Sequence, residues 1–436
     1  MKQNRLCYIS RNYYNLTSAG NKAKTDNEDT LAEMGAINLG LPRTIKNSKI
    51  LAFFLDLIGI IRACILIQKG DVLFLQYPVK KYFSFLCHVA HLKGAKTVSL
   101  IHDLGSFRRK KLTIQKEINR LSNSDYIIAS NENMKGWLKE HGLKKPVGAL
   151  GLFDYRSASQ CLEEVTEREL VKVVYAGGLS MKKNSFLVDL SKTLNSWQLL
   201  VCGNKEGLQG LQDNPLITYQ GFVPSEDFIK HIDADFGLVW DGNSLDGCSG
   251  ESGQYLKWNS PHKVSFYLRA GLPLIIWKEA AVAPIIEEAG AGITIGSLEE
   301  LDDKLANLTP EQEKEMKKQA VNLAQKLNKG GFLTKTLKEI NLDRMIQDKK
   351  VIIAIPIYRD LREEEIVALD NNLEILRNYS TVLIKPTGLN TNALKERYPQ
   401  VGEIEVSNQW LGTINGIMGY NEMMTSPDFY SLFSDY

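Results

Sequence analysis

The sequence predicts an α/β protein built from two successive Rossmann-like domains, each a parallel sheet wrapped by helices. Short apolar runs rich in β-branched residues alternate with longer helical patterns from the amino terminus onward. The same rhythm begins again after a polar, irregular stretch at residues 154–169. A chain of 436 residues also exceeds one ordinary core, since domains usually contain about 100 to 200 residues.

Nine short segments have the composition of buried strands. In the first half they are residues 6–10, 72–76, 97–102 and 126–130. In the second half they are residues 171–176, 198–202, 217–220, 236–240 and 274–277. We therefore expect an amino-terminal domain over residues 1–153, a linker over 154–169 and a second domain over 170–296.

The remainder of the chain has two further parts. Residues 297–346 are helical and highly charged, and we expect them to brace the two halves. Another α/β segment then begins, with strands expected at 351–356 and 381–385 and a helix at 363–379. Residues 347–436 offer about three strands, fewer than most independent α/β domains contain, so this segment is interpreted as a truncated unit.

The composition is that of a folded, nearly neutral protein. Apolar residues make up 44% and charged residues 24%, values typical of soluble globular proteins. The 53 basic and 51 acidic residues give a net charge of +2, too small to attract a polyanion, so nucleic acid is not expected as a partner. Six dispersed cysteines without a CxxC pair favour reduced thiols in the cytoplasm over zinc or disulfides.

One apolar segment, residues 50–68, is almost long enough to cross a bilayer. It contains Asp56 and Arg62, and each such charge costs about 2.5 to 3.5 kcal/mol at the centre of a membrane. We therefore expect a buried helix rather than a membrane span. The amino terminus, MKQNRLCYIS, has the pattern of a short strand and not of an export signal.

The most informative segment follows the expected strand at 236–240. A polar loop leads to Pro261, His262 and Lys263, which open a helix at the carboxyl edge of the sheet, where ligands of α/β sheets bind. The amides of the first helical turn attract anions, and Lys263 beside them suits a diphosphate. The competing interpretation is a helix start with a solvated lysine.

Two other turns in this half have features of a nucleotide site. Gly177 and Gly178 follow a strand and allow close backbone approach, with Lys182 and Lys183 near the start of the next helix. Tyr219 precedes a glycine turn where a base could stack. Glycine used only for its backbone freedom and an ordinary apolar anchor are the competing interpretations.

Taken together, these segments resemble a known family. AGGLSMKKNSFL, YQGFVPSEDF, VWDGNS, NSPHKVSFYLRAGLPLI and the early TSAGNKAKTDNEDTLAEMG are similar to the bacterial galactofuranosyltransferase and adhesin-glucosyltransferase group of GT-B enzymes. The resemblance covers about residues 1–340 and implies two facing Rossmann-like domains. The implied donor nucleotide contacts are Gly177, Gly178, Lys182, Lys183, Tyr219, Asp241, Ser249, His262 and Lys263.

One position departs from the pattern of the group. Gly178 stands where relatives often carry Asn, so no donor specificity is inferred from that residue. The carboxyl-terminal block resembles the first part of a domain family of unknown function from bacterial polysaccharide clusters.

The resemblance assigns the acceptor side to the amino-terminal half. Gly20 and Lys22 follow the first strand and are expected in a glycine loop at the cleft, the competing interpretation being a surface turn. His102 and Asp103 end another strand at the same edge. An inverting transfer needs a base for the acceptor hydroxyl, for which Asp103 is the first choice and His102 the second; a helix cap is the competing interpretation.

A basic patch follows that strand. It consists of Arg108, Arg109, Lys110 and Lys111. The patch fits a lipid-linked pyrophosphate acceptor or the anionic cytoplasmic leaflet, with a solvated helix start as the competing interpretation.

No metal is expected. Asp233 and Asp235 match a metal-binding DxD triplet but precede a strand, so they are interpreted as a turn. His88 and His91 have no third ligand nearby and are interpreted as packing residues. The donor would then be activated without metal by the helix start at Lys263.

The sequence thus predicts an inverting hexosyltransferase that uses a UDP-sugar, UDP-galactofuranose or UDP-glucose, and no other cofactor. The acceptor is expected to be a saccharide in surface polysaccharide or glycoprotein assembly, and lipid linkage, peripheral contact with the inner membrane face and homo-oligomerisation are left open. A sugar-nucleotide epimerase and a non-catalytic subunit of a glycosyltransferase complex are the alternatives.

Overall fold

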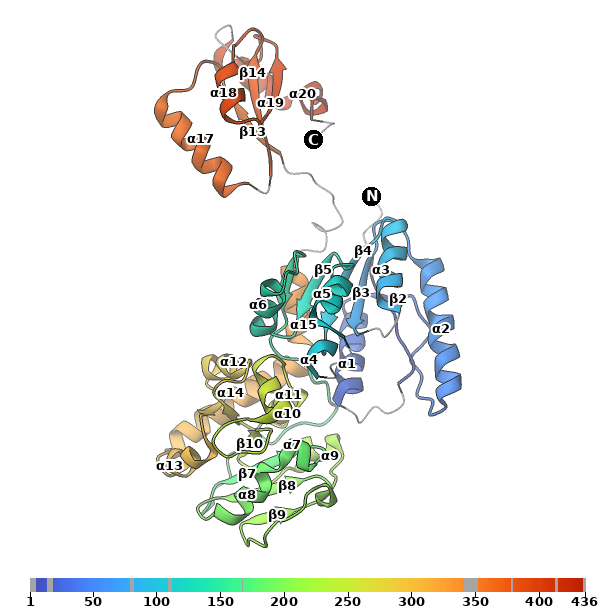
Figure 1. Ribbon diagram of the computed structural model, residues 1–436, viewed down its shortest axis with the longest axis vertical. Coiled ribbons are helices and arrows are strands. Elements are labelled where there is room, and N and C mark those ends of the chain that lie inside the picture. Colours follow the sequence, from blue (N-terminus) through green and yellow to red (C-terminus); the bar gives the residue numbers. More distant parts are fainter. Residues whose placement is uncertain are drawn as a thin grey trace. The chain divides into compact units, whose positions relative to one another are not determined.

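A computed structural model describes residues 5–13, 19–78, 82–108, 112–166, 168–340, 352–377, 379–411 and 415–433, without the side chains of Ala19, Arg108 and Lys205. The chain forms two compact units, Met1–Ile346 and Gln347–Tyr436 (Figure 1).

The first half of the larger unit is a parallel sheet with the order β2-β1-β3-β4-β5-β6. Its strands are β1 Leu6–Tyr8, β2 Ile37–Asn38, β3 Val72–Tyr77, β4 Lys96–Ile101, β5 Tyr126–Ala129 and β6 Val147–Ala149. Its helices are α1 Ala19–Glu33, α2 Lys49–Leu66, α3 Phe83–Leu92, α4 Gly105–Arg108, α5 Ile114–Leu121 and α6 Glu132–Glu140. The strand order reverses between β1 and β3, which makes this pair the switch point of the sheet.

The second half repeats this design with the order β12-β11-β10-β7-β8-β9. Its strands are β7 Lys172–Ala176, β8 Gln198–Cys202, β9 Ile217–Tyr219, β10 Phe236–Val239, β11 Leu274–Trp277 and β12 Gly292–Ile295. Its α-helices are α7 Met181–Asn184, α8 Phe186–Thr193, α9 Ser225–His231, α10 Gly250–Gln254, α11 His262–Arg269 and α12 Ala283–Ala289. Short 3-10 turns lie at η2 Lys205–Gly207, η3 Tyr255–Lys257 and η4 Leu298–Glu300. Here the switch point lies between β7 and β10.

The two halves are joined by the last helices of the unit, α13 Leu301–Ala306, α14 Pro310–Asn328 and α15 Gly331–Glu339. α14 contacts α11 of the second half, and α15 contacts α1 of the first. The carboxylate of Asp154 accepts hydrogen bonds from the amides of Phe332 and Leu333, at 3.1 and 2.9 Å, and so caps α15. The segment after β6 is therefore partly a buried structural element and not only a polar connection.

All nine expected strands are present, with ends that differ by at most two residues. Three further strands of this unit, β2, β6 and β12, were not predicted. They contain two to four residues and the sequences IN, VGA and GITI, too short for an apolar run to stand out.

The expectation of a buried helix at residues 50–68 is wrong in one respect. The helix α2 is present, but only Ala52, Gly59, Ile60 and Ala63 are buried. Its outer face exposes the apolar side chains of Ile50, Leu51, Phe53, Phe54, Ile58, Ile61 and Ile65. The segment is apolar on all sides, so its sequence could not reveal that only one narrow stripe meets the sheet. Among the described residues, no helix is long and apolar enough to cross a membrane.

The smaller unit contains a parallel sheet with the order β13-β14-β15. Its strands are β13 Ile352–Pro356, β14 Ser380–Pro386 and β15 Gly402–Val406, and its helices are α17 Glu363–Ile375, α18 Asn392–Arg397, α19 Gly416–Thr425 and α20 Pro427–Ser431. Val382 and Ile384 form a small core with Met423 and Phe429. The helix predicted at residues 363–379 is present as α17, but it ends at Ile375, four residues earlier than predicted.

Candidate functional site

The second half of the larger unit places α11 directly against the strands of its switch point. The Tyr267 hydroxyl of α11 accepts a hydrogen bond from the Ala176 amide at the end of β7, at 2.6 Å. The same ring covers Gly237 of β10, where an added Cβ would lie 2.5 Å from Tyr267 Cγ. Only glycine at this position lets the helix approach so closely. The amino terminus of α11 is thereby held at the carboxyl edge of the sheet.

The turns after β7 and β10 are bonded to each other. The Gly242 amide donates to the Lys183 carbonyl at 2.7 Å, and the Phe186 amide donates to the Gly242 carbonyl at 3.3 Å. Gly242 has a φ of 123°, and a Cβ there would collide with the Ser249 backbone. Gly177 has a φ of 149°, whereas Gly178 has no positive φ and no atom within 4 Å of an added Cβ. The glycine requirement therefore rests on Gly177 and Gly242, not on Gly178.

Two lysines converge on one carboxylate at this switch point. Lys263 Nζ lies 3.2 Å from Asp241 Oδ1, and Lys183 Nζ lies 3.5 Å from Asp241 Oδ2. The Tyr175 hydroxyl also donates to Asp241 Oδ1, at 2.9 Å, and its ring lies 4.1 Å beneath Lys263 Nζ. Asn184 in turn donates to the Tyr175 hydroxyl. The cluster joins β7, α7, β10 and α11 in one charged site.

Burial dominates the electrostatics of this cluster. Asp241 is 6% exposed and the Lys263 side chain 11%. Desolvation lowers the pKa of Lys263 to about 8, against the opposing effect of Asp241, while the charge of Lys183 lowers it further. The ammonium of Lys263 is thus held by an ion pair and by the face of an aromatic ring, and Asp241 sits beneath the lysines.

The structure distinguishes the two lysines that the sequence left equivalent. Lys182 lies on the surface, 77% exposed, and pairs with Glu251 at 3.1 Å. Lys183 is half as exposed and points to Asp241. Successive helical residues are about 100° apart, so only one of them can face the sheet. Lys183 is the one that joins Lys263.

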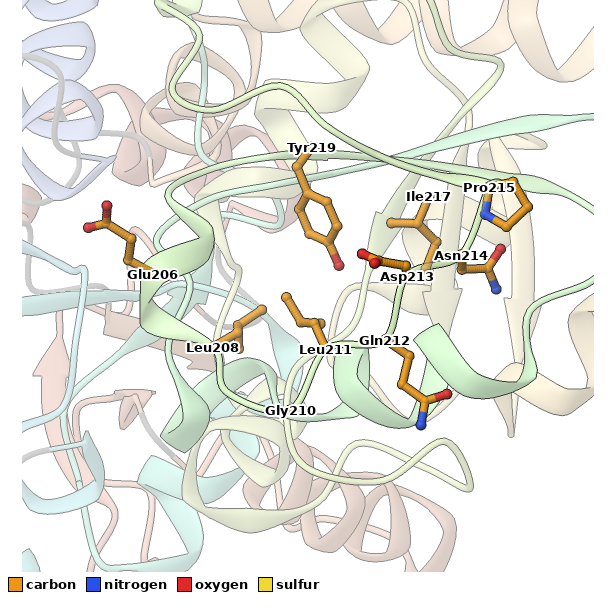
Figure 2. A pocket seen from close by; sticks show the side chains of 10 residues that line it. All are labelled: Glu206, Leu208, Gly210, Leu211, Gln212, Asp213, Asn214, Pro215, Ile217 and Tyr219. Atoms are coloured by element: carbon orange, nitrogen blue, oxygen red, sulfur yellow. The ribbon is translucent and has the colours of Figure 1, made fainter.

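The other expected nucleotide contacts lie around this cluster or beside it. Ser249 precedes α10, and its hydroxyl bonds to Asn243 Oδ1 at 2.5 Å, so it fixes the polar loop after β10. Tyr219 ends β9, two strands from β7, and lines a pocket of about 720 Å³. Figure 2 shows its ring pointing toward Leu211 and Asp213 in that pocket. The stacking role of Tyr219 stays a prediction.

His262 lies where α11 faces the amino-terminal half. Its ring stands 4.9 Å from the Tyr155 ring, and its Nε2 atom is buried without a hydrogen-bond partner. Burial lowers the pKa of His262 to about 3, and the nearby Lys22 ammonium lowers it further. His262 is therefore neutral at physiological pH.

Gly20 and Lys22 do not lie in a loop, contrary to the expectation. They belong to the first turns of α1, because the helical pattern extends back to Ala19. Thr17 and Ser18 of the same motif lie outside the described residues. Gly20 is exposed, whereas Lys22 bonds to the Asp26 carboxylate and the Arg156 carbonyl. Lys22 thereby reaches the segment that joins the halves.

His102 and Asp103 follow β4 as expected. The first amides of α4, those of Gly105 and Ser106, donate to Glu117 at 2.8 and 2.7 Å. Asp103 Oδ1 instead accepts a hydrogen bond from the Tyr255 hydroxyl of the second half, at 3.0 Å. The contact places Asp103 between the two halves.

The environment of His102 differs from that of Asp103. Its Nε2 atom lies 2.9 Å from Gln76 Oε1, and its ring stacks on Phe153 at 4.9 Å. Burial lowers the pKa of His102 well below its ordinary value, and Lys24 and His262 lower it further. His102 is thus held in place by Gln76 and Phe153, and the choice of Asp103 over His102 as the base stays a prediction.

The discounted residues have structural partners. Asp233 pairs with Arg168 and Lys172, and Asp235 accepts from the Lys172 amide at 2.8 Å, which makes the triplet a turn before β10. His88 and His91 are exposed on α3, so their expected packing role is wrong; the buried stripe of α3 is formed by Phe83, Leu86, Cys87 and Ala90. Within the described part of the chain, no three His, Cys, Asp or Glu side chains are grouped as for a metal ion. Residues 109–111 of the basic patch lie outside the described residues, as does the side chain of Arg108.

Sequence reasoning missed the residues that connect the halves at the site. The Tyr155 ring packs at a tilt against the His262 ring, Tyr255 bonds to Asp103, and Asp26 binds Lys22 together with the Arg156 amide. Except for the pair of Asp26 and Lys22, which lie four residues apart, these contacts join positions more than a hundred residues apart, and no local motif marks them. Asp26 lies in a run of polar residues of α1 that are buried, Thr25, Asp26, Asn27, Glu28 and Thr30.

Two Rossmann-like sheets in one compact unit give the chain the GT-B architecture found in glycosyltransferases. The fold is similar to that of sucrose-phosphate synthase from Thermosynechococcus elongatus, with a TM-score of 0.51, 12% identity and coverage of 79% of this chain and 99% of that one.

Comparison of sequences gives the family. Residues 6–152 match the amino-terminal domain and residues 173–340 the carboxyl-terminal domain of glucosyltransferase 3-like proteins. The chain is 30% identical to the beta-1,6-galactofuranosyltransferase WbbI of Escherichia coli K12, over 74% of this chain and 94% of that protein. It is 26% identical to glucosyltransferase 3 of Streptococcus gordonii, over 62% and 78%. The chain belongs to the glucosyltransferase 3-like family and is a hexosyltransferase; sugar transfer is favoured over epimerisation.

Proposed function

We propose that the protein transfers galactofuranose or glucose from a UDP-sugar to a saccharide acceptor, with inversion and without a metal. Relatives of this chain are named for both sugars, a galactofuranosyltransferase and glucosyltransferases. The acceptor belongs to surface polysaccharide or glycoprotein assembly. The single observation that carries the proposal is the convergence of Lys183 and Lys263 at the β7/β10 switch point.

The donor diphosphate is proposed to bind to the two lysines and the first amides of α11. Two ammonium groups beside a helix amino terminus balance a diphosphate and stabilise the UDP leaving group as negative charge develops on it. Asp241 and Tyr175 hold the lysines in place before the donor arrives, so little reorganisation is needed. No further cofactor is required by this arrangement.

Asp103 is proposed as the base that takes the proton of the acceptor hydroxyl. It lies at the end of β4 and meets Tyr255 of the donor half. A carboxylate so placed can face an acceptor held by the first half and a donor held by the second. The proton leaves the acceptor oxygen as that oxygen bonds to the anomeric carbon and the bond to UDP breaks.

The proposal is tested by measuring UDP release with a panel of UDP-sugars and saccharide acceptors, with and without a chelator. The expected result is acceptor-dependent release from UDP-galactofuranose or UDP-glucose that a chelator does not change. Loss of turnover on chelation would refute metal independence. Conversion of the UDP-sugar without acceptor would identify the epimerase alternative, and absence of release from every pair would support a non-catalytic subunit.

Peripheral contact with the inner face of the cytoplasmic membrane is also proposed. The outer face of α2 supports it, because Ile50, Phe54, Ile58 and Ile65 are each more than half exposed and Lys49 lies at the helix start. Flotation with anionic liposomes tests this, with binding expected to fall in Phe54→Ser/Ile58→Ser. Loss of a dimer in the same variant, measured by light scattering, would instead assign the face to a second copy.

A further inference from the structure

We propose that a pocket in the amino-terminal half binds a phosphate group carried by the acceptor saccharide. The pocket has a volume of about 580 Å³, in the range of small-molecule sites. The inference deepens the function proposed above and rests on it, since it names the chemical class of the acceptor. Its lining residues are Arg11, Asn12, Tyr13, Asn21, Lys24, Lys49, Ala52, Phe53, Asp56 and Tyr82.

The pocket lies at the switch point of the first sheet. Arg11, Asn12 and Tyr13 follow β1, and Tyr82 follows β3, the two strands between which the strand order reverses. Asn21 and Lys24 come from α1, and the remaining wall is the beginning of α2. Ligands of open α/β sheets bind in the crevice at this point. The donor cluster occupies the corresponding position in the second sheet, so the two sites are related by the same rule.

The charges of the pocket select an anion. Three basic side chains, those of Arg11, Lys24 and Lys49, line it together with one acid, Asp56. The Asp56 carboxylate already has partners within the protein: it accepts hydrogen bonds from the Asn12 backbone amide at 3.1 Å and from the Arg11 guanidinium at 3.4 Å. An excess of two positive charges in a partly enclosed site favours a phosphate over a neutral group.

Aromatic walls suit the remainder of a glycosyl ligand. Tyr13, Phe53 and Tyr82 line the same pocket. The position of Tyr13 is fixed by a hydrogen bond that its hydroxyl donates to Glu28 Oε1, at 2.6 Å. Apolar ring faces of this kind pack against the carbon faces of sugars or against an alkyl chain.

The pocket is also placed for transfer. Lys24 lines it, and Gln76 connects this part of α1 to His102: Gln76 Nε2 donates to the Lys24 carbonyl at 3.0 Å, and Gln76 Oε1 lies 2.9 Å from His102 Nε2. A single side chain, that of Gln76, therefore separates His102 from the Lys24 wall of the pocket. A phosphorylated saccharide seated by Lys24 would extend toward His102 and the neighbouring Asp103, where the proposed base lies.

The test compares three probes of the same hexose: the neutral octyl hexoside, the free hexose 1-phosphate and a decyl-diphospho-hexose. Binding to the full chain is measured by calorimetry with saturating UDP, so that the donor site is occupied. Lys49→Glu reverses a charge of the pocket at an exposed position. Lys46→Glu makes the same change three residues earlier, outside the lining residues.

The expected result is that a phosphorylated probe binds at least about tenfold more tightly than the octyl hexoside, and that Lys49→Glu weakens this binding about tenfold while Lys46→Glu does not. Preference for the decyl-diphospho-hexose assigns a lipid-linked source, and equal binding of the hexose 1-phosphate assigns the free ester. Equal affinity for all three probes, or equal effects of the two substitutions, would overturn the inference. Binding is measured without turnover. A failed transferase assay would therefore refute the proposed function without changing the outcome of the binding experiment.

Discussion

Lys263 Nζ lies 3.2 Å from Asp241 Oδ1, and this ion pair ties the start of α11 to the turn that follows β10. The same carboxylate receives Lys183 from α7 and the Tyr175 hydroxyl from β7. One buried acid thus fixes the positions of both lysines that we assign to the donor diphosphate.

Removal of the carboxylate is expected to cost more stability than removal of either lysine. Asp241→Ala leaves the nearly buried Lys263 without its partner, for which the expected loss is about 3 to 5 kcal/mol of unfolding free energy. Lys263→Met leaves Asp241 with Lys183 and Tyr175 and should cost clearly less. Urea unfolding of the two variants measures the difference, and equal losses would show that Asp241 does not organise the cluster.

Donor affinity is expected to decrease as the pH rises above about 8. The pKa of Lys263 in the free protein is about 8 because the side chain is desolvated, so its charge is lost through this range. A bound diphosphate stabilises the charged form, and UDP binding therefore takes up a proton at alkaline pH. The Kd for UDP should rise between pH 8 and 9.5 by up to about tenfold per unit. Lys263→Met should bind weakly at every pH, and an unchanged pH profile in that variant would contradict the assignment.

The burial of Asp154 is expected to make the protein more stable at low pH than at high pH, whereas a salt-bridged acid has the opposite effect. Burial raises its pKa to about 7, against the opposing hydrogen bonds from the Leu333 and Phe332 amides. The folded state therefore binds a proton that the unfolded state releases between about pH 4 and pH 7, and this contribution to stability is lost as the pH rises. The stability advantage of the wild type over Asp154→Asn should be larger at pH 5 than at pH 8. Unfolding curves at the two pH values check this, and an advantage that grows with pH would contradict it.

Asp103 and Tyr255 provide a test of the catalytic base. Asp103→Asn is expected to lower kcat by about 10² to 10⁴ with little change in the donor KM. Tyr255→Phe removes the hydrogen bond from the Tyr255 hydroxyl to Asp103 and should lower kcat much less. Steady-state rates of UDP release separate the two cases. Equal losses of kcat in both variants would mean that Asp103 serves only to join the halves.

Much of the fold could be predicted from the sequence because parallel strands buried on both faces appear as continuous apolar runs. The runs at β3, β4, β7 and β10 are of this kind, and the glycine turn at Gly177 follows directly from one of them. Short edge strands such as β2 carry no such run. The exposure of the outer face of α2 could not be predicted either, because a helix that is mostly apolar gives no indication of which side packs against the core.

The site could be predicted only as far as local patterns extend. The helix start at Lys263 and the turn at Gly177 were evident, but the choice between Lys182 and Lys183 depends on the orientation of α7 toward Asp241. The contact of Asp103 with Tyr255 spans 152 positions and arises only when two separate sheets face each other. Lys22 was expected in a loop because its glycine neighbour suggested a turn, yet the helix of α1 includes both residues.

Calorimetric titration of UDP into Lys183→Met and Lys182→Met tests the central claim most directly. The two substitutions remove the same charge from adjacent residues of α7, but only Lys183 lies with Lys263 on Asp241. We expect the Kd for UDP to rise about tenfold or more in Lys183→Met and to remain near the wild-type value in Lys182→Met. Equal affinities in the two variants, or a larger loss in Lys182→Met, would contradict the placement of the donor diphosphate at the β7/β10 switch point.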